Sequence, residues 1–143
     1  MNDNRETIAI PAWFRVAAIG ALLWELLGCA LYLIRMTTDP ASLPIDERAI
    51  FNATPTWVLA AFALAVWIGL AGAVLLVMRR RLAQPLLLVS LLALVVQNSS
   101  LLLDPELRNL VASDQLLVPF LIVVVSYSIW HLAWQAQKSG WLR

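Results

Sequence analysis

The sequence has little that could build a metal centre or a disulfide bond. It contains a single cysteine, Cys29, and a single histidine, His131. One cysteine excludes an intrachain disulfide, and the two side chains together fall short of the four ligands of a structural zinc site. The sequence also has no glycine-rich phosphate loop and no recognisable hydrolase motif. We therefore expect no metal, no other cofactor and no enzymatic activity, and we assign no catalytic residue.

Charged residues are scarce, and neither sign dominates. Ten basic residues nearly balance nine acidic ones, which gives a formal net charge of +1. This balance provides no polybasic surface for DNA or RNA, so we expect no nucleic-acid partner. Hydrophobic residues, by contrast, make up 62% of the 143-residue chain. A water-soluble domain of this size leaves much of its surface wet, so it could not bury so many apolar side chains in one core.

Four apolar runs approach the length of about 20 residues that a membrane-crossing helix needs. They cover residues 12–36, 56–78, 82–103 and 116–135. The runs are continuously apolar, whereas the strands of a membrane β-barrel alternate apolar and polar residues. The short link at Arg79–Arg81 forces the second and third runs into an antiparallel hairpin. We therefore predict an all-α fold, in which residues 1–143 form a single integral membrane domain, an antiparallel four-helix bundle surrounded by the lipid bilayer.

The positions of the basic residues predict how this bundle is oriented. Lysine and arginine near the ends of a span tend to stay in the cytoplasm. One side carries most of them: Arg5, Arg15, Arg79, Arg80, Arg81, Lys138 and Arg143. The other side carries Arg35, Arg48 and Arg108. We therefore predict that both termini lie in the cytoplasm.

Both predicted outer loops contain signals for short helices at the membrane surface. In the first loop, the mixed polar and apolar residues 46–51 are typical of an interfacial helix. In the second loop, Asp104 precedes Pro105 and Glu106. This combination favours a helix start, because aspartate caps a helix and proline suits its first position. We predict a second surface helix over residues 105–112.

Motifs along nearly the whole chain resemble those of one known family. They include Pro11–Phe14, Leu23–Trp24, Tyr32–Leu33, Thr54–Val58, Ala60–Ala63, Arg79–Arg80, Pro85–Leu86 and Gly140–Trp141. In these motifs the chain resembles a family of short four-span proteins of the bacterial inner membrane, which automatic annotation often labels "sugar transporter". The resemblance implies a multi-pass location in that membrane and a transporter-like activity with no defined substrate. Glu25 departs from the family pattern, which commonly has asparagine after the tryptophan of the first span.

Glu25 is the polar residue that most needs an explanation. At a rise of about 1.5 Å per residue, it lies roughly 18 Å beyond Trp13, near the middle of an apolar core about 30 Å thick. An ionisable residue at that depth costs about 2.5–3.5 kcal/mol by insertion scales, so we expect its side chain to face the bundle interior. Side chains at comparable depth come from every other run: Trp67, Gln97, Asn98 and Tyr127.

We predict that this central layer binds a polar solute or a proton. The candidate residues are Trp24, Glu25, Tyr32, Trp67, Gln97, Asn98, Tyr127 and His131. A proton relay would run from Glu25 through Gln97 or Tyr127 to His131. Ser90, Gln97 and Asp104 recur every seven positions, and they mark the face of the third run that we expect to point inward.

Helix packing is the predicted role of three glycines inside the first two runs. They are Gly28, Gly69 and Gly72. Small residues at such positions let neighbouring membrane helices approach closely. We expect these contacts to be made within the bundle.

The sequence supports two functional hypotheses of different classes. In the first, the protein is transporter-like and binds a neutral polar or cationic solute at Glu25. It would act as a homo-oligomer, because four short helices enclose little volume. In the second, it is a non-catalytic accessory or scaffold subunit of a larger membrane complex. Glu25 would then only hydrogen-bond neighbouring helices, as buried polar side chains in membrane bundles often do.

Overall fold

The computed structural model describes residues 9–143, which form helices and no strand. In chain order these are α1 (Ala12–Thr37), η1 (Pro40–Ser42), α2 (Ile45–Ala53), α3 (Thr56–Val77), α4 (Ala83–Leu103), α5 (Pro105–Leu110), η2 (Ser113–Leu116) and α6 (Leu117–Lys138). The predicted all-α fold is therefore confirmed. Arg5, which entered the prediction of orientation, lies outside the described residues.

Four of these helices, α1, α3, α4 and α6, are long and apolar enough to cross a membrane. They indicate a multi-pass membrane protein. Their bounds follow the apolar runs closely, with one larger difference. The last helix continues to Lys138, beyond the predicted end at residue 135. An apolar run ends where side chains become polar, whereas backbone hydrogen bonds carry the helix further, to the cap at Ser139.

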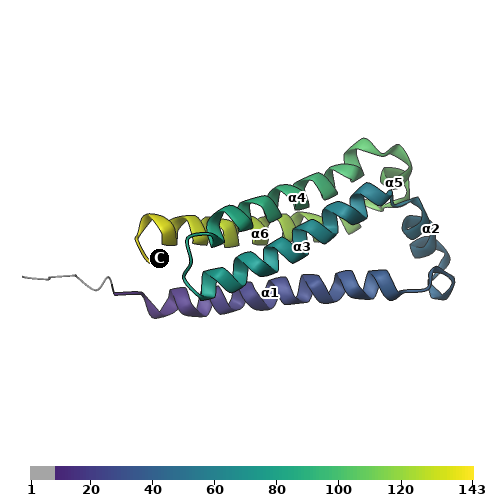
Figure 1. The fold of residues 1–143 in the computed structure, drawn as a ribbon. Coiled ribbons are helices and arrows are strands. Elements are labelled where there is room, and N and C mark those ends of the chain that lie inside the picture. Colours follow the sequence, from purple (N-terminus) through teal and green to yellow (C-terminus); the bar gives the residue numbers. More distant parts are fainter. Residues whose placement is uncertain (1–8) are drawn as a thin grey trace, which may run out of the picture.

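The main contacts between the long helices join α1 to α3, α3 to α4 and α4 to α6, and α6 lies behind α3 and α4 in the view of Figure 1. Thus α3 packs against α1 and α4, and α6 packs mainly against α4. Figure 1 also shows that the two ends of the bundle differ. We call the end with the connections 38–55 and 104–116 the loop end, and the end with the Arg79–Arg81 turn and the chain terminus at Arg143 the arginine end.

The arginine end is closed by backbone pairing with the end of the chain. The Arg143 N–H donates a hydrogen bond of 2.6 Å to the Arg79 carbonyl, and the Arg81 N–H donates one of 3.0 Å to the Arg143 carbonyl. Arg79 has a positive φ of 60°, which turns the chain between α3 and α4. Buried apolar side chains fill this half of the bundle: Phe14, Ala18, Ala21, Leu76, Ala83, Leu87, Ile129, Ala133, Ala136 and Leu142.

Side-chain contacts hold the short helices at the loop end. The Arg35 Nη2 donates to the Phe51 carbonyl at 3.3 Å and to the Thr54 Oγ1 at 3.2 Å. Its guanidinium also lies 3.7 Å from the centroid of the Phe51 ring. These contacts join α2 to α1. The predicted interfacial helix over residues 46–51 thus lies within α2.

The predicted cap of the second surface helix is also present. The Asp104 side chain accepts hydrogen bonds from the backbone N–H groups of Glu106 and Leu107, at 3.0 and 3.3 Å. The helix ends at Leu110, two residues before the predicted end at 112, because the backbone of Val111 is extended.

Close packing of α3 against α4 depends on Gly72. A Cβ atom at this position would lie 2.8 Å from the Leu87 Cγ and 3.2 Å from the Leu87 backbone nitrogen. Both distances are shorter than ordinary contacts, and the backbone atom cannot move aside alone. Gly72 therefore sets the distance between these two helices, which fits its predicted packing role.

We expect Gly72→Ala to lower the free energy of unfolding by about 1–3 kcal/mol, the usual cost of overpacking. Thermal unfolding in mild detergent would measure this change. Gly20→Ala is the matched control, because a Cβ there would meet nothing within 4 Å. Equal stabilities of the two variants would contradict the proposed packing constraint.

Candidate functional site

A cavity of about 210 Å³ lies between the four long helices. Its lining comes from α1 (Trp24, Glu25, Leu27, Gly28, Leu31), α3 (Phe62, Ala65, Val66), α4 (Ser90, Leu94, Gln97, Asn98) and α6 (Pro119, Ile122, Ser126). We call it the central cavity. Its wall is mostly apolar, with a few polar side chains, as is usual for sites that bind small molecules.

The carboxyl group of Glu25 lies where three helices meet. Glu25 is 7% exposed. A Cβ atom added to Gly69 of α3 would lie 2.8 Å from the Glu25 Cδ and 2.7 Å from the Ser90 Oγ of α4. The absence of a side chain at Gly69 therefore makes room for both polar groups. The space at Gly28 is less crowded, since a Cβ there would lie 3.4 Å from the Val66 Cγ1.

Three hydrogen-bond donors in this part of the bundle are engaged by backbone carbonyls. The Ser90 Oγ donates to the Ala65 carbonyl at 2.6 Å, and the Asn98 Nδ2 donates to the Leu94 carbonyl at 2.8 Å. The Cys29 Sγ donates to the Val66 carbonyl at 3.4 Å. These contacts leave no free proton on the Ser90 hydroxyl for the carboxyl group.

Two acceptors in the cavity remain without a donor. Within residues 9–143, the Glu25 carboxyl group accepts no hydrogen bond and has no basic side chain within 4.0 Å. The Gln97 Oε1 is buried and also lacks a partner in that part of the chain. Buried polar atoms are usually paired, so these acceptors call for donors from a bound molecule or water. The arrangement suits a ligand that carries N–H or O–H groups, and a cationic one best.

The central cavity continues toward the loop end. A second cavity of about 390 Å³ lies there, and it shares five lining residues with the central cavity: Leu31, Phe62, Gln97, Asn98 and Pro119. Its lining includes Arg35 and Thr54. The guanidinium of Arg35 is held against the Phe51 ring and the Thr54 hydroxyl. The two cavities therefore adjoin at these shared residues, between Glu25 and the short helices.

The structure brings together only part of the predicted central layer. Trp24, Glu25, Gln97 and Asn98 all line the central cavity. Ser90 lines it too, so the seven-residue spacing with Gln97 correctly marked the inward face of α4.

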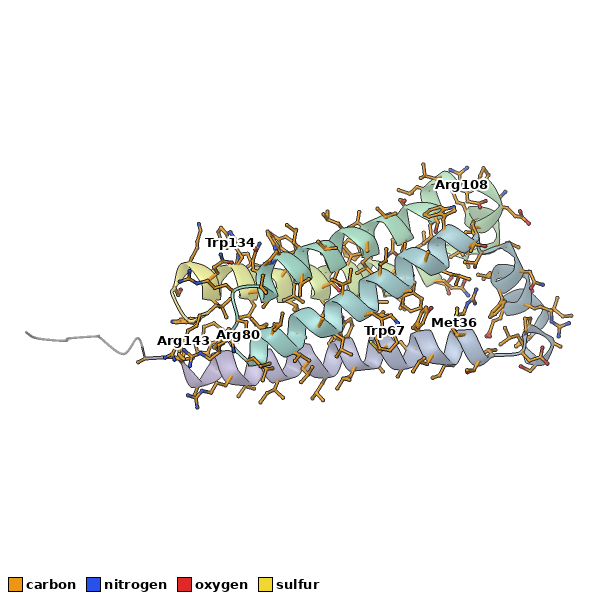
Figure 2. The ribbon with its side chains drawn as sticks, viewed as in Figure 1. Met36, Trp67, Arg80, Arg108, Trp134 and Arg143 are labelled. Carbon is orange, nitrogen blue, oxygen red and sulfur yellow. The ribbon has the colours of Figure 1, made fainter. Side chains whose placement is uncertain are left out.

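Trp67 and Tyr32 lie outside the cavity. Trp67 lies on α3 and is 46% exposed, and its side chain sits near α1 (Figure 2). Its ring contacts that of Tyr32, with centroids 6.4 Å apart, and Tyr32 also contacts Phe62 at 5.4 Å. Trp67 therefore points away from the cavity. It is two residues from both Ala65 and Gly69, which is about 200° around a helix.

The predicted relay through Tyr127 to His131 is not formed. Tyr127 is 51% exposed, and the cavity wall on α6 comes from other residues, including Ser126. The Tyr127 and His131 rings instead stack on each other along α6, 6.1 Å apart, and His131 lies 5.5 Å from Trp134. This row ends with the Lys138 Nζ, 3.8 Å from the Trp134 ring. We call these four residues the aromatic row.

The sequence analysis missed some lining residues that carry a visible signal. Ser126 is a polar residue inside the last apolar run, directly before the predicted site residue Tyr127. Pro119 is a proline inside the same run. Phe62 and Leu94 carry no signal, since apolar residues surround them in the chain.

No family model matches this chain, and no curated protein or solved structure matches it either. Among the residues that the structure describes, no group of three or more His, Cys, Asp or Glu side chains could hold a metal ion.

We expect Glu25→Gln to leave the unfolding midpoint in mild detergent no lower than that of the wild type. The reason is that no described hydrogen bond is lost with the carboxylate. Ser90→Ala should lower the stability, by about 0.6 kcal/mol, because its bond to the Ala65 carbonyl joins α4 to α3. Thermal unfolding of both variants measures the difference. A clear loss for Glu25→Gln would mean that the carboxyl group serves packing.

Proposed function

We propose that the protein is a small, transporter-like protein that binds a small polar solute, preferably a cation, at Glu25 in the central cavity. The observation that carries this proposal is that one cavity holds the buried Gln97 Oε1, which has no partner, and the carboxyl group of the buried residue Glu25, which accepts no hydrogen bond within residues 9–143. A charged acceptor strengthens a hydrogen bond to a donor and adds attraction for a cation. The resemblance to short four-span membrane proteins supports the same class of activity.

The proposal includes a place in the bacterial inner membrane. The four long helices would cross the bilayer as an antiparallel bundle, with the arginine end and both termini in the cytoplasm. The excess of arginine beside the Arg79–Arg81 turn supports this orientation. The connected cavities would then open toward the outer face. A solute would enter past Arg35 and stop at Glu25.

The size of the cavity favours a solute of few atoms. About 210 Å³ corresponds to roughly seven water molecules at about 30 Å³ each. This is below the range of about 300–1,000 Å³ that is typical of sites for larger ligands. Ethanolamine is a suitable probe, because it combines an ammonium and a hydroxyl group. Ethylene glycol is its neutral counterpart of similar size, and glucose tests the sugar label.

We expect the purified wild-type protein to bind ethanolamine more tightly than ethylene glycol or glucose. Glu25→Gln should weaken ethanolamine binding about 10- to 100-fold, because a hydrogen bond to a charged group is worth about 1.5–3 kcal/mol. Isothermal titration calorimetry in lipid nanodiscs measures these affinities. Trp67→Leu is the matched control, since Trp67 lies at similar depth outside the cavity, and it should bind like the wild type.

Uptake into vesicles completes the test of transport. Vesicles that contain the wild-type protein should accumulate labelled ethanolamine faster than vesicles that contain Glu25→Gln. Equal rates for both proteins and for protein-free vesicles would refute the transport activity. Equal affinities of the wild type and Glu25→Gln for all three probes would refute the binding site itself.

The aromatic row supports the second hypothesis, an accessory or scaffold subunit. Its rings lie on α6, which packs mainly against α4 and therefore keeps much of its surface free for lipid, for a second copy or for another membrane protein. Aromatic side chains supply large contact areas at protein interfaces. In this alternative the row would pack against a partner chain.

We expect the combined change Tyr127→Leu and Trp134→Leu to reduce the size of the assembly in mild detergent if this alternative holds. Light scattering after size-exclusion chromatography measures that size. Glu25→Gln is the control and should leave it unchanged. An altered assembly together with absent solute binding would replace the transporter hypothesis, whereas an unaltered assembly would refute the role of the aromatic row.

A further inference from the structure

A groove at the arginine end combines two cations with an apolar floor. It measures about 240 Å³ and lies between the start of α1 and the end of α3. Its lining consists of Phe14, Arg15, Ala18, Ile19, Val77 and Arg79. The two arginines lie near helix ends, and Ala18 and Ile19 lie about one turn further along α1 than Arg15. The groove therefore leads from charged to purely apolar surroundings.

Arg79 is held in place while much of its guanidinium stays available. Its carbonyl accepts a hydrogen bond from the Arg143 N–H, and its Nε donates to the Trp141 carbonyl at 3.1 Å. The terminal nitrogens have no hydrogen bond within residues 9–143. Neither Arg79 nor Arg15 has a carboxylate within 4.0 Å in the same part of the chain. Two cations thus line one groove without an anion that the structure describes.

Two tryptophans lie at the same end of the bundle as this groove. Trp13 is exposed, and its ring lies 5.7 Å from that of Trp141. Indole rings of membrane proteins gather where headgroups meet the acyl chains. Figure 2 shows Arg80 at the same end of the bundle, where it adds to the positive charge.

We propose that this groove binds one anionic phospholipid. The phosphate would lie between the guanidinium groups of Arg15 and Arg79, because guanidinium groups suit phosphate oxygens. The first part of an acyl chain would follow Ala18, Ile19 and Val77 between α1 and α3. Basic pockets between membrane helices are known binding places for acidic lipid headgroups. The site depends on insertion in a membrane and is independent of solute binding at Glu25.

Native mass spectrometry tests this site on the detergent-purified protein with phosphatidylglycerol and phosphatidylcholine of identical acyl chains. We expect the wild type to retain one phosphatidylglycerol in preference to phosphatidylcholine. Arg15→Gln should weaken that binding about five-fold, since one basic residue contributes about 1 kcal/mol near an anionic lipid surface. Arg15→Lys should keep most of the affinity. Equal binding of the two lipids by the wild type would overturn the proposal.

Two further variants, Arg81→Gln and Ile19→Ser, and a competition with inorganic phosphate distinguish a lipid site from binding by diffuse positive charge and from a site for a free anion. Arg81→Gln removes the same charge at the same end but outside the groove, so it should bind phosphatidylglycerol like the wild type. A loss equal to that of Arg15→Gln would overturn the proposal in favour of diffuse charge. Ile19→Ser should weaken lipid binding, and millimolar inorganic phosphate should not displace the lipid. Displacement by phosphate would mean that the groove holds a free anion instead.

Discussion

The structure depends on the missing side chain at Gly69. At this position, the carboxyl group of Glu25 and the hydroxyl of Ser90 reach the same point beside α3 from two different helices. A larger residue would have to displace both groups. This glycine therefore sets the place of the carboxyl group in the central cavity, whereas Gly72, which faces the Leu87 backbone, sets the distance between α3 and α4.

The two halves of the bundle are filled in different ways, and this decides where a cavity can exist. In the half near the arginine end, Phe14, Leu76 and Leu142 fill the interior, and the end of the chain pairs with the Arg79–Arg81 turn. Toward the loop end, the interior contains Gln97, Asn98 and the connected cavities. The site around Glu25 therefore adjoins a further cavity on one side and a packed core on the other. Passage across the whole protein would require that core to repack, and α6 is the least buried of the four long helices.

The sequence predicts where each long helix begins and ends more accurately than it predicts the direction in which a side chain points from the helix axis. The bounds of α1 and α3 follow apolar runs because hydropathy changes where a helix leaves the apolar region. The level of a residue along the bundle could also be predicted, because the rise per residue of a helix is fixed, and Glu25, Gln97 and Asn98 do meet at one cavity. Direction around the axis could not be predicted where a helix is apolar on all sides. Trp67 therefore turned out to face outward. On α4, polar residues seven positions apart marked one face, and Ser90 and Gln97 do line the cavity.

The hydrogen bonds inside the bundle bear on whether Glu25 serves packing or binding. A polar side chain that holds helices together has a partner on a neighbouring helix. Ser90 and Cys29 meet this condition, because they donate to backbone carbonyls of α3. Glu25 does not, since within residues 9–143 its carboxyl group accepts no hydrogen bond although it lies beside the Ser90 hydroxyl. Burial of a polar group without a partner costs free energy and contributes nothing to helix association. A ligand that donates hydrogen bonds would remove that cost, which favours binding over packing as the role of this residue.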